Sequence, residues 1–160
     1  MKDFFRNIFN KYSSLIIAIA IPLIVGGFSA LLTIGNMDIY PELNRPALAP
    51  PGFIFPIVWT ILYTLMGVAS YLIIKSNRNN SLAIYLYSLQ LVFNFFWSII
   101  FFNLQMYLFA FIWLIFLWIL ILLTIVEFYK ISKPAAYLLI PYLVWVTLAG
   151  YLNLSIYLLN

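Results

Sequence analysis

The segment from Asn44 to Tyr63 reads NRPALAPPGFIFPIVWTILY, and it decides how this chain is organised. It places four of the chain's eight prolines directly before an apolar run, at Pro46, Pro50, Pro51 and Pro56. Proline fixes φ, lacks the N–H donor and disfavours a helical conformation in the residue before it. We therefore predict a stiff, non-helical segment that ends where a long apolar helix begins, and we interpret it as a lid over a pocket.

The composition of the chain indicates an integral membrane protein. Its 160 residues are 66% hydrophobic, 20% aromatic and only 8% charged. Soluble domains carry about 25% charged residues, so this chain cannot build a water-facing surface. The length fits a single domain covering residues 1–160. The net charge of +4 reflects cations in loops and gives no sign of a nucleic-acid partner.

The residue inventory limits the chemistry. The chain contains no cysteine and no histidine, so disulfides, thiolate nucleophiles and the commonest metal ligand are missing. None of its four acidic residues falls inside a clean apolar stretch: Asp3, Asp38, Glu42 and Glu127. We expect no metal site, no resident cofactor, no hydrolytic or acid–base catalytic set and no buried proton relay.

Five stretches are long and apolar enough to cross a bilayer, which takes about 20 residues as a helix. They cover residues 15–34, 53–74, 82–102, 106–126 and 135–159. The charge-free run from Asn79 to Val126 is too long for one span, and Asn103-Leu104-Gln105 is its natural break. Pro134 suits a helix start. The predicted fold is an all-α bundle of five transmembrane helices, with the proline-rich loop between the first two as a lid.

The distribution of positive charge predicts the orientation of the bundle. With five spans, seven of the eight lysines and arginines fall on one side, and Arg45 alone falls on the other. Positive residues accumulate in cytoplasmic loops. We therefore predict a cytoplasmic N-terminus and an outer C-terminus, in the cell membrane. The apolar core before a cleavage point at Ala18-Ile19-Ala20 is too short for a signal peptide, so we expect an uncleaved first span.

Three spans each carry aromatic and polar residues on one helix face. These sets are Trp59, Tyr63 and Gly67; Gln90, Asn94, Trp97 and Phe101; and Tyr142, Trp145, Ala149 and Asn153 or Leu152. Amides at membrane depth face the bundle or a cavity. The inward surface thus combines π-faces with a few amides and hydroxyls, as in a pocket for a flat apolar ligand. The alternative for each aromatic is packing or a place in an interfacial belt.

The motifs on these faces resemble those of the translocator protein family, also called the tryptophan-rich sensory protein or peripheral-type benzodiazepine receptor family. The first comprises Arg45-Pro46, Pro50-Pro51, Val58-Trp59-Thr60, Leu62-Tyr63, Met66-Gly67 and Ser70-Tyr71-Leu72. The second comprises Gln90-Leu91, Asn94, Trp97 and Ile100-Phe101-Phe102, and the third comprises Pro141-Tyr142-Leu143, Trp145, Ala149 and Leu152-Asn153. The resemblance covers about residues 40 to 153.

This resemblance implies a five-helix bundle, commonly a homodimer, whose pocket is closed by the loop after the first span. It implies binding of porphyrins such as protoporphyrin IX and of benzodiazepine-site ligands. The ligand-binding residues it implies are Arg45, Pro51, Trp59, Tyr63, Asn94, Trp97, Tyr142, Trp145, Ala149 and Leu152. Some bacterial members are reported to degrade protoporphyrin IX in light and oxygen, which would give Trp59 and Trp145 a catalytic role.

The chain departs from the family pattern in its lid and near its end. Arg45 stands where members usually have lysine, and Leu48 stands where most have tryptophan. The weak sterol motif needs a basic residue after tyrosine, and no charge follows Tyr157. We therefore expect an altered ligand preference at the lid and little support for sterol binding.

Three functions remain open from the residues. The first is a tetrapyrrole sensor or transporter, in which the macrocycle stacks on tryptophans and its propionates meet Arg45. We expect it to prefer metal-free porphyrin, because histidine and cysteine are missing as axial ligands. The second is an enzyme that degrades porphyrin by light and oxygen. The third is a scaffold without a small ligand, for which Gly26 and Ala30 form a weak packing motif.

Overall fold

The computed structural model describes residues 2–76 and 78–160, and the regular elements of this part of the chain are all helical. They are α1 (Lys2–Thr33), the 3₁₀ turn η1 (Ile34–Asn36), α2 (Ile39–Glu42), α3 (Ile54–Ile74), α4 (Ser81–Ser98), the π-helical turn η2 (Ile99–Asn103), α5 (Tyr107–Ile131), α6 (Lys133–Leu138) and α7 (Ile140–Leu159). The predicted all-α fold is confirmed.

Five helical stretches in the described residues are long and apolar enough to span a membrane. They cover Tyr12–Asn36, Ile54–Ile74, Ser81–Asn103, Tyr107–Ile131 and Lys133–Leu159. Helices satisfy all their backbone hydrogen bonds internally, which is why a lipid-embedded chain of this composition folds into them. The five predicted spans are therefore confirmed, and the protein is an integral, multi-pass membrane protein.

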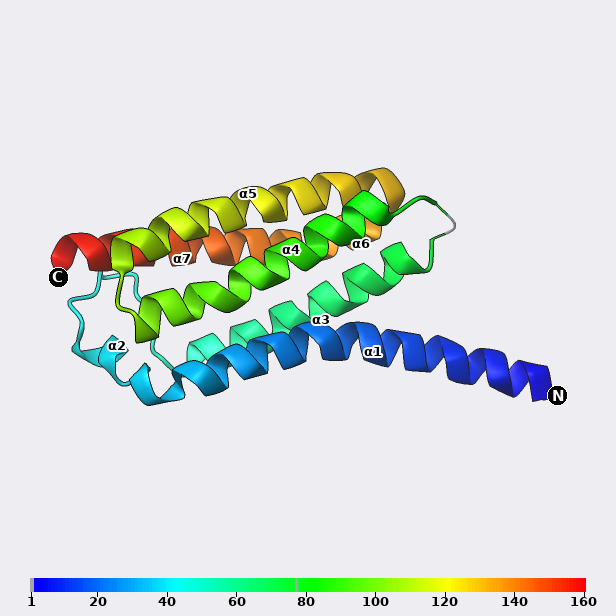
Figure 1. Ribbon diagram of the computed structural model, residues 1–160, viewed down its shortest axis with the longest axis horizontal. Helices are drawn as coiled ribbons and strands as arrows, with labels where there is room; N and C mark the ends of the chain where they lie inside the picture. The colour runs from blue at the N-terminus through cyan, green and yellow to red at the C-terminus, as the bar shows by residue number, and fades with distance from the viewer. Residues whose placement is uncertain (1, 77) are drawn as a thin grey trace.

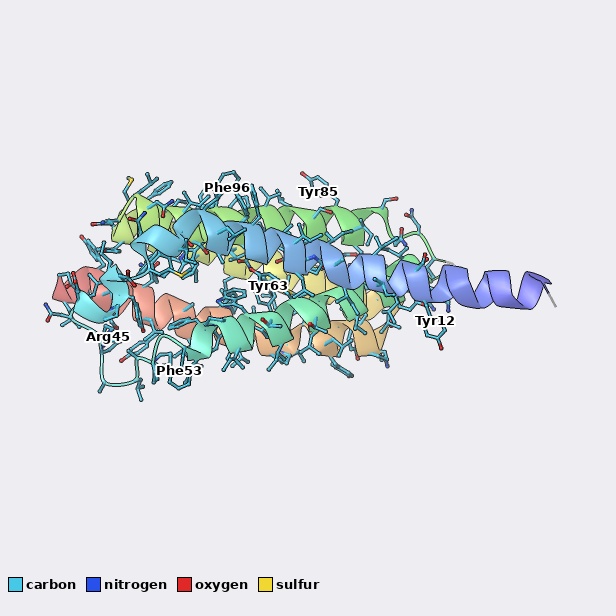
Figure 2. The ribbon with its side chains drawn as sticks, turned by 90° about the horizontal axis from the view of Figure 1, so that it is seen from below. Tyr12, Arg45, Phe53, Tyr63, Tyr85 and Phe96 are labelled. Carbon is cyan, nitrogen blue, oxygen red and sulfur yellow. The ribbon has the colours of Figure 1, made fainter. Side chains whose placement is uncertain are left out.

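The five long helices lie roughly along one axis, and α2 sits at one end of the bundle together with the end of α7 (Figure 1). We call residues 39–53 the lid and this end of the bundle the lid end. The N-terminal turns of α1 extend beyond the other helices at the opposite end (Figure 1). Figure 2 shows Arg45 at the lid end and Tyr63 about midway along the bundle.

Two spans contain breaks in the α-helix. The third span ends in the π-helical turn η2, and Gln105 then adopts a φ of 52°. This confirms the predicted break at residues 103–105. The fifth span divides at Leu139, a break that the sequence pattern did not predict. Pro141 has no N–H and cannot donate to the preceding helical turn. Just before it, the N–H of Leu139 donates to the carbonyl of Ala136, three residues back, at 3.1 Å.

Small residues let α1 approach α3 closely. A Cβ atom at Gly67 would lie 2.8 Å from the carbonyl oxygen of Ala18, on the backbone of α1. The missing side chain at Gly67 therefore lets the backbone of α1 come close to α3. A Cβ atom at Gly26 would instead overlap the ring of Tyr63, so the missing side chain on α1 makes room for an aromatic ring of α3.

The lid consists of a short helix followed by the predicted non-helical segment. Pro41 lies inside α2, before that segment, and residues 44–53 contain no helix, so the prediction of a non-helical segment that ends where α3 begins is confirmed. Proline is compatible with a first helical turn, because the N–H that it lacks has no partner there anyway. The remainder of the lid forms two turns that begin at prolines: Ala49 donates to the carbonyl of Pro46, and Ile54 donates to that of Pro51, both at 3.0 Å.

Candidate ligand-binding site

A cluster of stacked rings lies midway between α3 and α7. Trp59 and Tyr63 are one turn apart on α3, and their ring centroids lie 5.2 Å apart in a stacked arrangement. The edge of Tyr142 on α7 meets Trp59 at 6.1 Å with an interplanar angle of 66°. Tyr63 and Tyr142 are buried, and Trp59 is half-buried. Two of the three predicted helix faces therefore meet as expected.

A chain of buried hydrogen bonds joins this cluster to α4. The hydroxyl of Tyr63 donates to Oδ1 of Asn94 at 3.2 Å, and Nδ2 of Asn94 donates to the hydroxyl of Tyr142 at 2.8 Å. The hydroxyl of Tyr142 then donates to Oε1 of Gln90 at 2.8 Å. Three helices thus meet through polar side chains at membrane depth, where unpaired polar groups are costly.

Trp145 lies on α7, one turn closer to the lid than Tyr142. Its ring meets that of Phe55 at a centroid distance of 5.8 Å and an angle of 69°. Phe55 in turn meets Tyr40 of α2 at 5.3 Å. The indole N–H of Trp145 is buried and has no hydrogen-bond partner among the described residues. Trp145 is therefore the point where the lid reaches the predicted site.

Arg45 caps this aromatic column from outside. Its guanidinium carbon lies 4.9 Å from the centroid of the Tyr40 ring, and Arg45 itself is exposed. The hydroxyl of Tyr40 donates to the carbonyl of Pro50 at 3.4 Å. Burial raises the pKa of Tyr40, and the adjacent Arg45 charge opposes that rise. The lid's single cation is thus held over the column and remains accessible.

Four predicted site residues are not part of the ring cluster of Trp59, Tyr63 and Tyr142: Trp97, Ala149, Leu152 and Pro51. Trp97 donates its indole N–H to Oδ1 of Asn153 at 3.2 Å and packs against Phe101, with 5.4 Å between ring centroids. Ala149 and Leu152 are buried on α7. Pro51 is exposed and shapes the turn that starts α3.

Three residues that matter at this site were not among the predicted ligand-binding residues. Phe55 precedes Trp59 by four positions, so helical spacing alone could have placed it on the same face. Gln90 was recognised only as a marker of the inward side of its helix. Tyr40 lies outside the spans, and nothing in the sequence pattern connects it to Arg45 or Phe55. We call Trp59, Tyr63, Gln90, Asn94, Tyr142 and Trp145 the aromatic–amide site.

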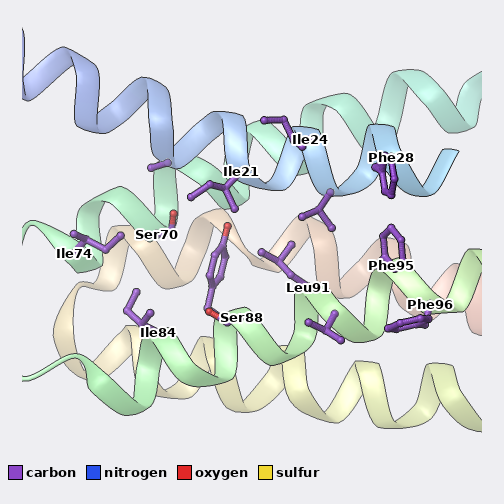
Figure 3. Close-up of a pocket in the computed structure, with 14 residues that line it drawn as sticks. Ile21, Ile24, Phe28, Ser70, Ile74, Ile84, Ser88, Leu91, Phe95 and Phe96 are labelled. Atoms are coloured by element: carbon purple, nitrogen blue, oxygen red, sulfur yellow. The ribbon is translucent and has the colours of Figure 1, made fainter. Parts of the chain in front are cut away.

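A separate groove in the described residues lies away from the predicted site. This groove of about 530 Å³ runs between α1, α3 and α4, and none of the predicted site residues lines it. Figure 3 shows its mostly aliphatic walls and the rings of Phe28 and Phe95 facing each other at one end. These two rings are stacked at 6.2 Å, and Ile24 on the α1 side is 67% exposed, so the groove faces lipid.

The groove offers little to orient a ligand. The hydroxyl of Ser70 already donates to the carbonyl of Gly67, and that of Tyr87 donates to the carbonyl of Met66. Ligand sites usually combine apolar walls with a few convergent polar groups. The aromatic–amide site meets that description better, although its rings now fill the space between them.

Metal binding is not indicated in the described part of the chain. No three histidine, cysteine, aspartate or glutamate side chains lie together there in a way that could hold an ion. What the site can supply is ring faces for stacking, amide and indole N–H groups for hydrogen bonds, and one arginine at the rim.

Five apolar helices, with aromatic rings and amides buried between them beneath a proline-rich lid, define an α-helical multi-pass membrane protein with an inward-facing aromatic site. Residues 18–159 match the TspO/MBR family, so the chain belongs to this family of membrane sensory and translocator proteins. The match confirms the resemblance and extends it to most of the first span.

Curated relatives from distant organisms agree with this assignment. The chain is 42% identical over 125 residues to the Tryptophan-rich protein TspO of Chlorobaculum tepidum, covering 76% of this chain and 78% of that protein. It is 37% identical over 155 residues to that of Archaeoglobus fulgidus, covering 96% and 99%. It is 34% identical over 118 residues to the Translocator protein of Bos taurus, covering 71% and 70%.

Proposed function

We propose that the protein binds a flat tetrapyrrole such as protoporphyrin IX at the aromatic–amide site and acts as its sensor or transporter. The observation that carries this proposal is the buried contact of Trp59, Tyr63 and Tyr142 with the amide of Asn94 behind them. Large ring faces with a few fixed polar groups are what a flat, mostly apolar ligand requires.

Ligand binding would exchange one set of ring contacts for another. The rings of Trp59 and Tyr63 now stack on each other, and a macrocycle would offer its own faces to them. Each aromatic stack contributes on the order of 1 kcal/mol beyond the burial of apolar area. Since the rings already pack in the ligand-free protein, the net gain comes mainly from the additional apolar surface of the macrocycle.

Arg45 would set the orientation of the bound ligand. Porphyrin propionates are anionic, and Arg45 is exposed at the rim of the column that leads to Trp145. Arginine can bind a carboxylate through two parallel hydrogen bonds. The propionates would therefore remain at the lid, and the opposite edge of the macrocycle would enter the bundle. Benzodiazepine-site ligands, which are apolar and aromatic, belong to the same proposal, and so does a homodimeric assembly.

Titration in detergent micelles tests this proposal, with tryptophan fluorescence quenching as the readout and protoporphyrin IX, haem and a sterol as ligands. We expect saturable quenching by protoporphyrin IX, weaker binding of haem and none of the sterol. Trp59→Ala should weaken porphyrin binding about tenfold, which corresponds to about 1.4 kcal/mol. Trp118→Ala is the matched control, because Trp118 on α5 bonds to Thr147 outside the site. Haem binding more tightly than protoporphyrin IX with a low-spin spectrum would refute the preference.

A second function, light-dependent porphyrin breakdown, is favoured by one further observation. Trp59 lies within stacking distance of Tyr63 and close to Tyr142, so oxidisable rings form a continuous series. A photoexcited porphyrin could take one electron from the indole and pass it to dioxygen, giving superoxide. Superoxide could take up the N–H proton of the oxidised indole, which leaves a neutral indolyl radical and a hydroperoxyl radical, with dioxygen as the oxidant. Addition of the hydroperoxyl radical to a meso carbon of the macrocycle would then begin its breakdown.

Illumination of the bound porphyrin in air separates binding from breakdown. If the protein is catalytic, bleaching gives a defined product, and Trp59→Phe and Trp145→Phe each abolish it while porphyrin remains bound. Trp113→Phe is the control, since Trp113 on α5 bonds to the carbonyl of Phe93. Equal bleaching in all variants would mean photosensitised damage without catalysis.

A further inference from the structure

The hydrogen-bond chain of the aromatic–amide site has a direction and an open end. Tyr63 donates to Asn94, Asn94 donates to Tyr142, and Tyr142 donates to Oε1 of Gln90. The chain stops at Nε2 of Gln90, which is buried and has no partner among the described residues. Only 1% of Gln90 is exposed, so bulk solvent cannot supply the missing partner.

The orientation of the Gln90 amide follows from the bonds around it. The hydroxyl of Tyr142 already accepts a hydrogen bond from Asn94, so its own proton needs an acceptor. Oε1 of Gln90 is that acceptor, at 2.8 Å. Exchanging the two ends of the amide would leave the Tyr142 proton facing another donor. The open group at Gln90 is therefore an N–H donor.

Trp145 provides a second open donor on the other side of the chain. Its indole nitrogen is also buried without a partner in the described part of the protein, and it can only donate. Trp145 lies three residues after Tyr142, or about 4.5 Å toward the lid, and Gln90 lies four residues before Asn94, about 6 Å away from it. The two donors thus flank the polar chain along the axis of the bundle.

The surroundings of Gln90 favour an uncharged partner. Arg45 lies at the lid end, and the other described cations, Lys75, Arg78, Lys130 and Lys133, lie where spans meet at the opposite end. An anion beside Gln90 would therefore be buried without a counter-charge, which costs far more than burying a carbonyl oxygen. A neutral oxygen acceptor satisfies the donor without that penalty.

We infer that Gln90 forms a subsite for an uncharged carbonyl oxygen, carried on the edge of the ligand opposite its carboxylates. The inference rests on the proposed function, in which Arg45 retains the carboxylates at the lid. It narrows the ligand class of that function. The expected ligand is a flat tetrapyrrole with anionic groups at one edge and a keto, formyl or lactam oxygen at the opposite edge. Trp145 supplies a second N–H for an acceptor closer to the lid.

Two synthetic porphyrins test the subsite directly. Mesoporphyrin IX and 2,4-diacetyldeuteroporphyrin IX carry the same propionates, but the opposite edge bears ethyl groups in the first and acetyl groups in the second. We expect the wild-type protein to bind the diacetyl compound about fivefold more tightly, the value of one ordinary hydrogen bond. In Gln90→Leu that ratio should fall to about one, and in the control Thr124→Val it should persist. Thr124 is likewise a buried polar residue, but it bonds within α5.

The infrared spectrum of the bound diacetyl compound gives a second readout that does not depend on affinity. Its carbonyl band should shift to lower wavenumber in the wild-type protein, whether or not Gln90→Leu folds, and it should return to the unbonded position in the variant. Equal affinities for the two porphyrins with an unshifted band would mean that an internal water satisfies Gln90, and would overturn this inference alone. Failure of both porphyrins to bind would overturn the proposed function as well.

Discussion

Asn160, which follows α7, holds the backbone of Asn44 in the lid from both sides. The N–H of Asn44 donates to Oδ1 of Asn160 at 3.0 Å, and Nδ2 of Asn160 donates to the carbonyl of Asn44 at 3.1 Å. The side chain of Asn44 also donates to the carbonyl of Leu159 at 3.4 Å. The residue next to Arg45 is thus fastened to the helix that carries Tyr142 and Trp145.

Removing this fastening should loosen the lid without unfolding the bundle. Asn160→Ala loses two hydrogen bonds to the lid, each worth about 1 kcal/mol, and one to the carbonyl of Ile156 within the same helix end. We expect porphyrin association and dissociation rates in stopped-flow fluorescence to rise together about tenfold, with little change in Kd. Asn36→Ala is the control, because Asn36 bonds to Asn103 at the same end of the bundle but outside the lid. Unchanged rates would show that the lid does not limit ligand access.

Gly67 should be the glycine most sensitive to enlargement. In Gly67→Ala the new methyl group would press on the backbone of Ala18 and Ile19, which cannot yield as a flexible side chain could. We expect a loss of about 1–3 kcal/mol, the usual cost of overpacking, seen as a lower Tm in detergent. Gly27→Ala is the control, since its methyl group would meet nothing within 4 Å and alanine favours the helix. Equal Tm values for Gly67→Ala and wild type would contradict the tight α1–α3 contact.

Arg45 should discriminate between charged and uncharged porphyrins. In Arg45→Ala we expect protoporphyrin IX to bind about threefold to fivefold more weakly, since an exposed ion pair contributes up to about 1 kcal/mol. The dimethyl ester of protoporphyrin IX, which has no carboxylate, should bind equally to both proteins. Arg45→Lys should recover part of the loss, because lysine keeps the charge but cannot bind a carboxylate through two bonds. The same loss for acid and ester would assign Arg45 to packing on Tyr40.

Tyr40 should make the lid sensitive to alkaline pH. Burial raises the pKa of Tyr40 above its usual 10.0, despite the opposing charge of Arg45, so the folded lid favours the neutral phenol. The stability that Tyr40 contributes is therefore complete below pH 10 and declines as the pH rises above it. We expect porphyrin dissociation to accelerate as the pH rises above 10 in the wild type. Tyr40→Phe, which has no ionisable group there, should remove that part of the pH dependence.

The helices and their inward faces could be predicted because both are local properties of the chain. Apolar runs of sufficient length place the spans, and the break at residues 103–105 and the helix start at Pro134 follow from local signals. Spacing of three or four residues places Trp59 with Tyr63 and Tyr142 with Trp145 on shared faces. The family match then confirmed the assignment, since the motifs on those faces carry it.

Relations between distant segments could not be predicted in the same way. Helical periodicity says which side of a helix points inward but not which partner it meets, or at what height along the axis. Two contacts depend on the axial positions of α4 and α3 relative to α7. They are the hydrogen bond from Tyr142 to Gln90 and the ring contact of Trp145 with Phe55. The break at Leu139 was not predicted either.

The amino-acid sequence by itself determined five membrane-spanning helices, a stiff segment before the second and the residue types available to a ligand, because lipid leaves the backbone no alternative to the helix. Only the tertiary structure decided that Asn160 fastens the lid and that Tyr40 links Arg45 to the site. It alone left the side-chain N–H groups of Gln90 and Trp145 without a partner among the described residues. Whether a donor is satisfied depends on every side chain that packs around it, and that is settled only when the helices meet.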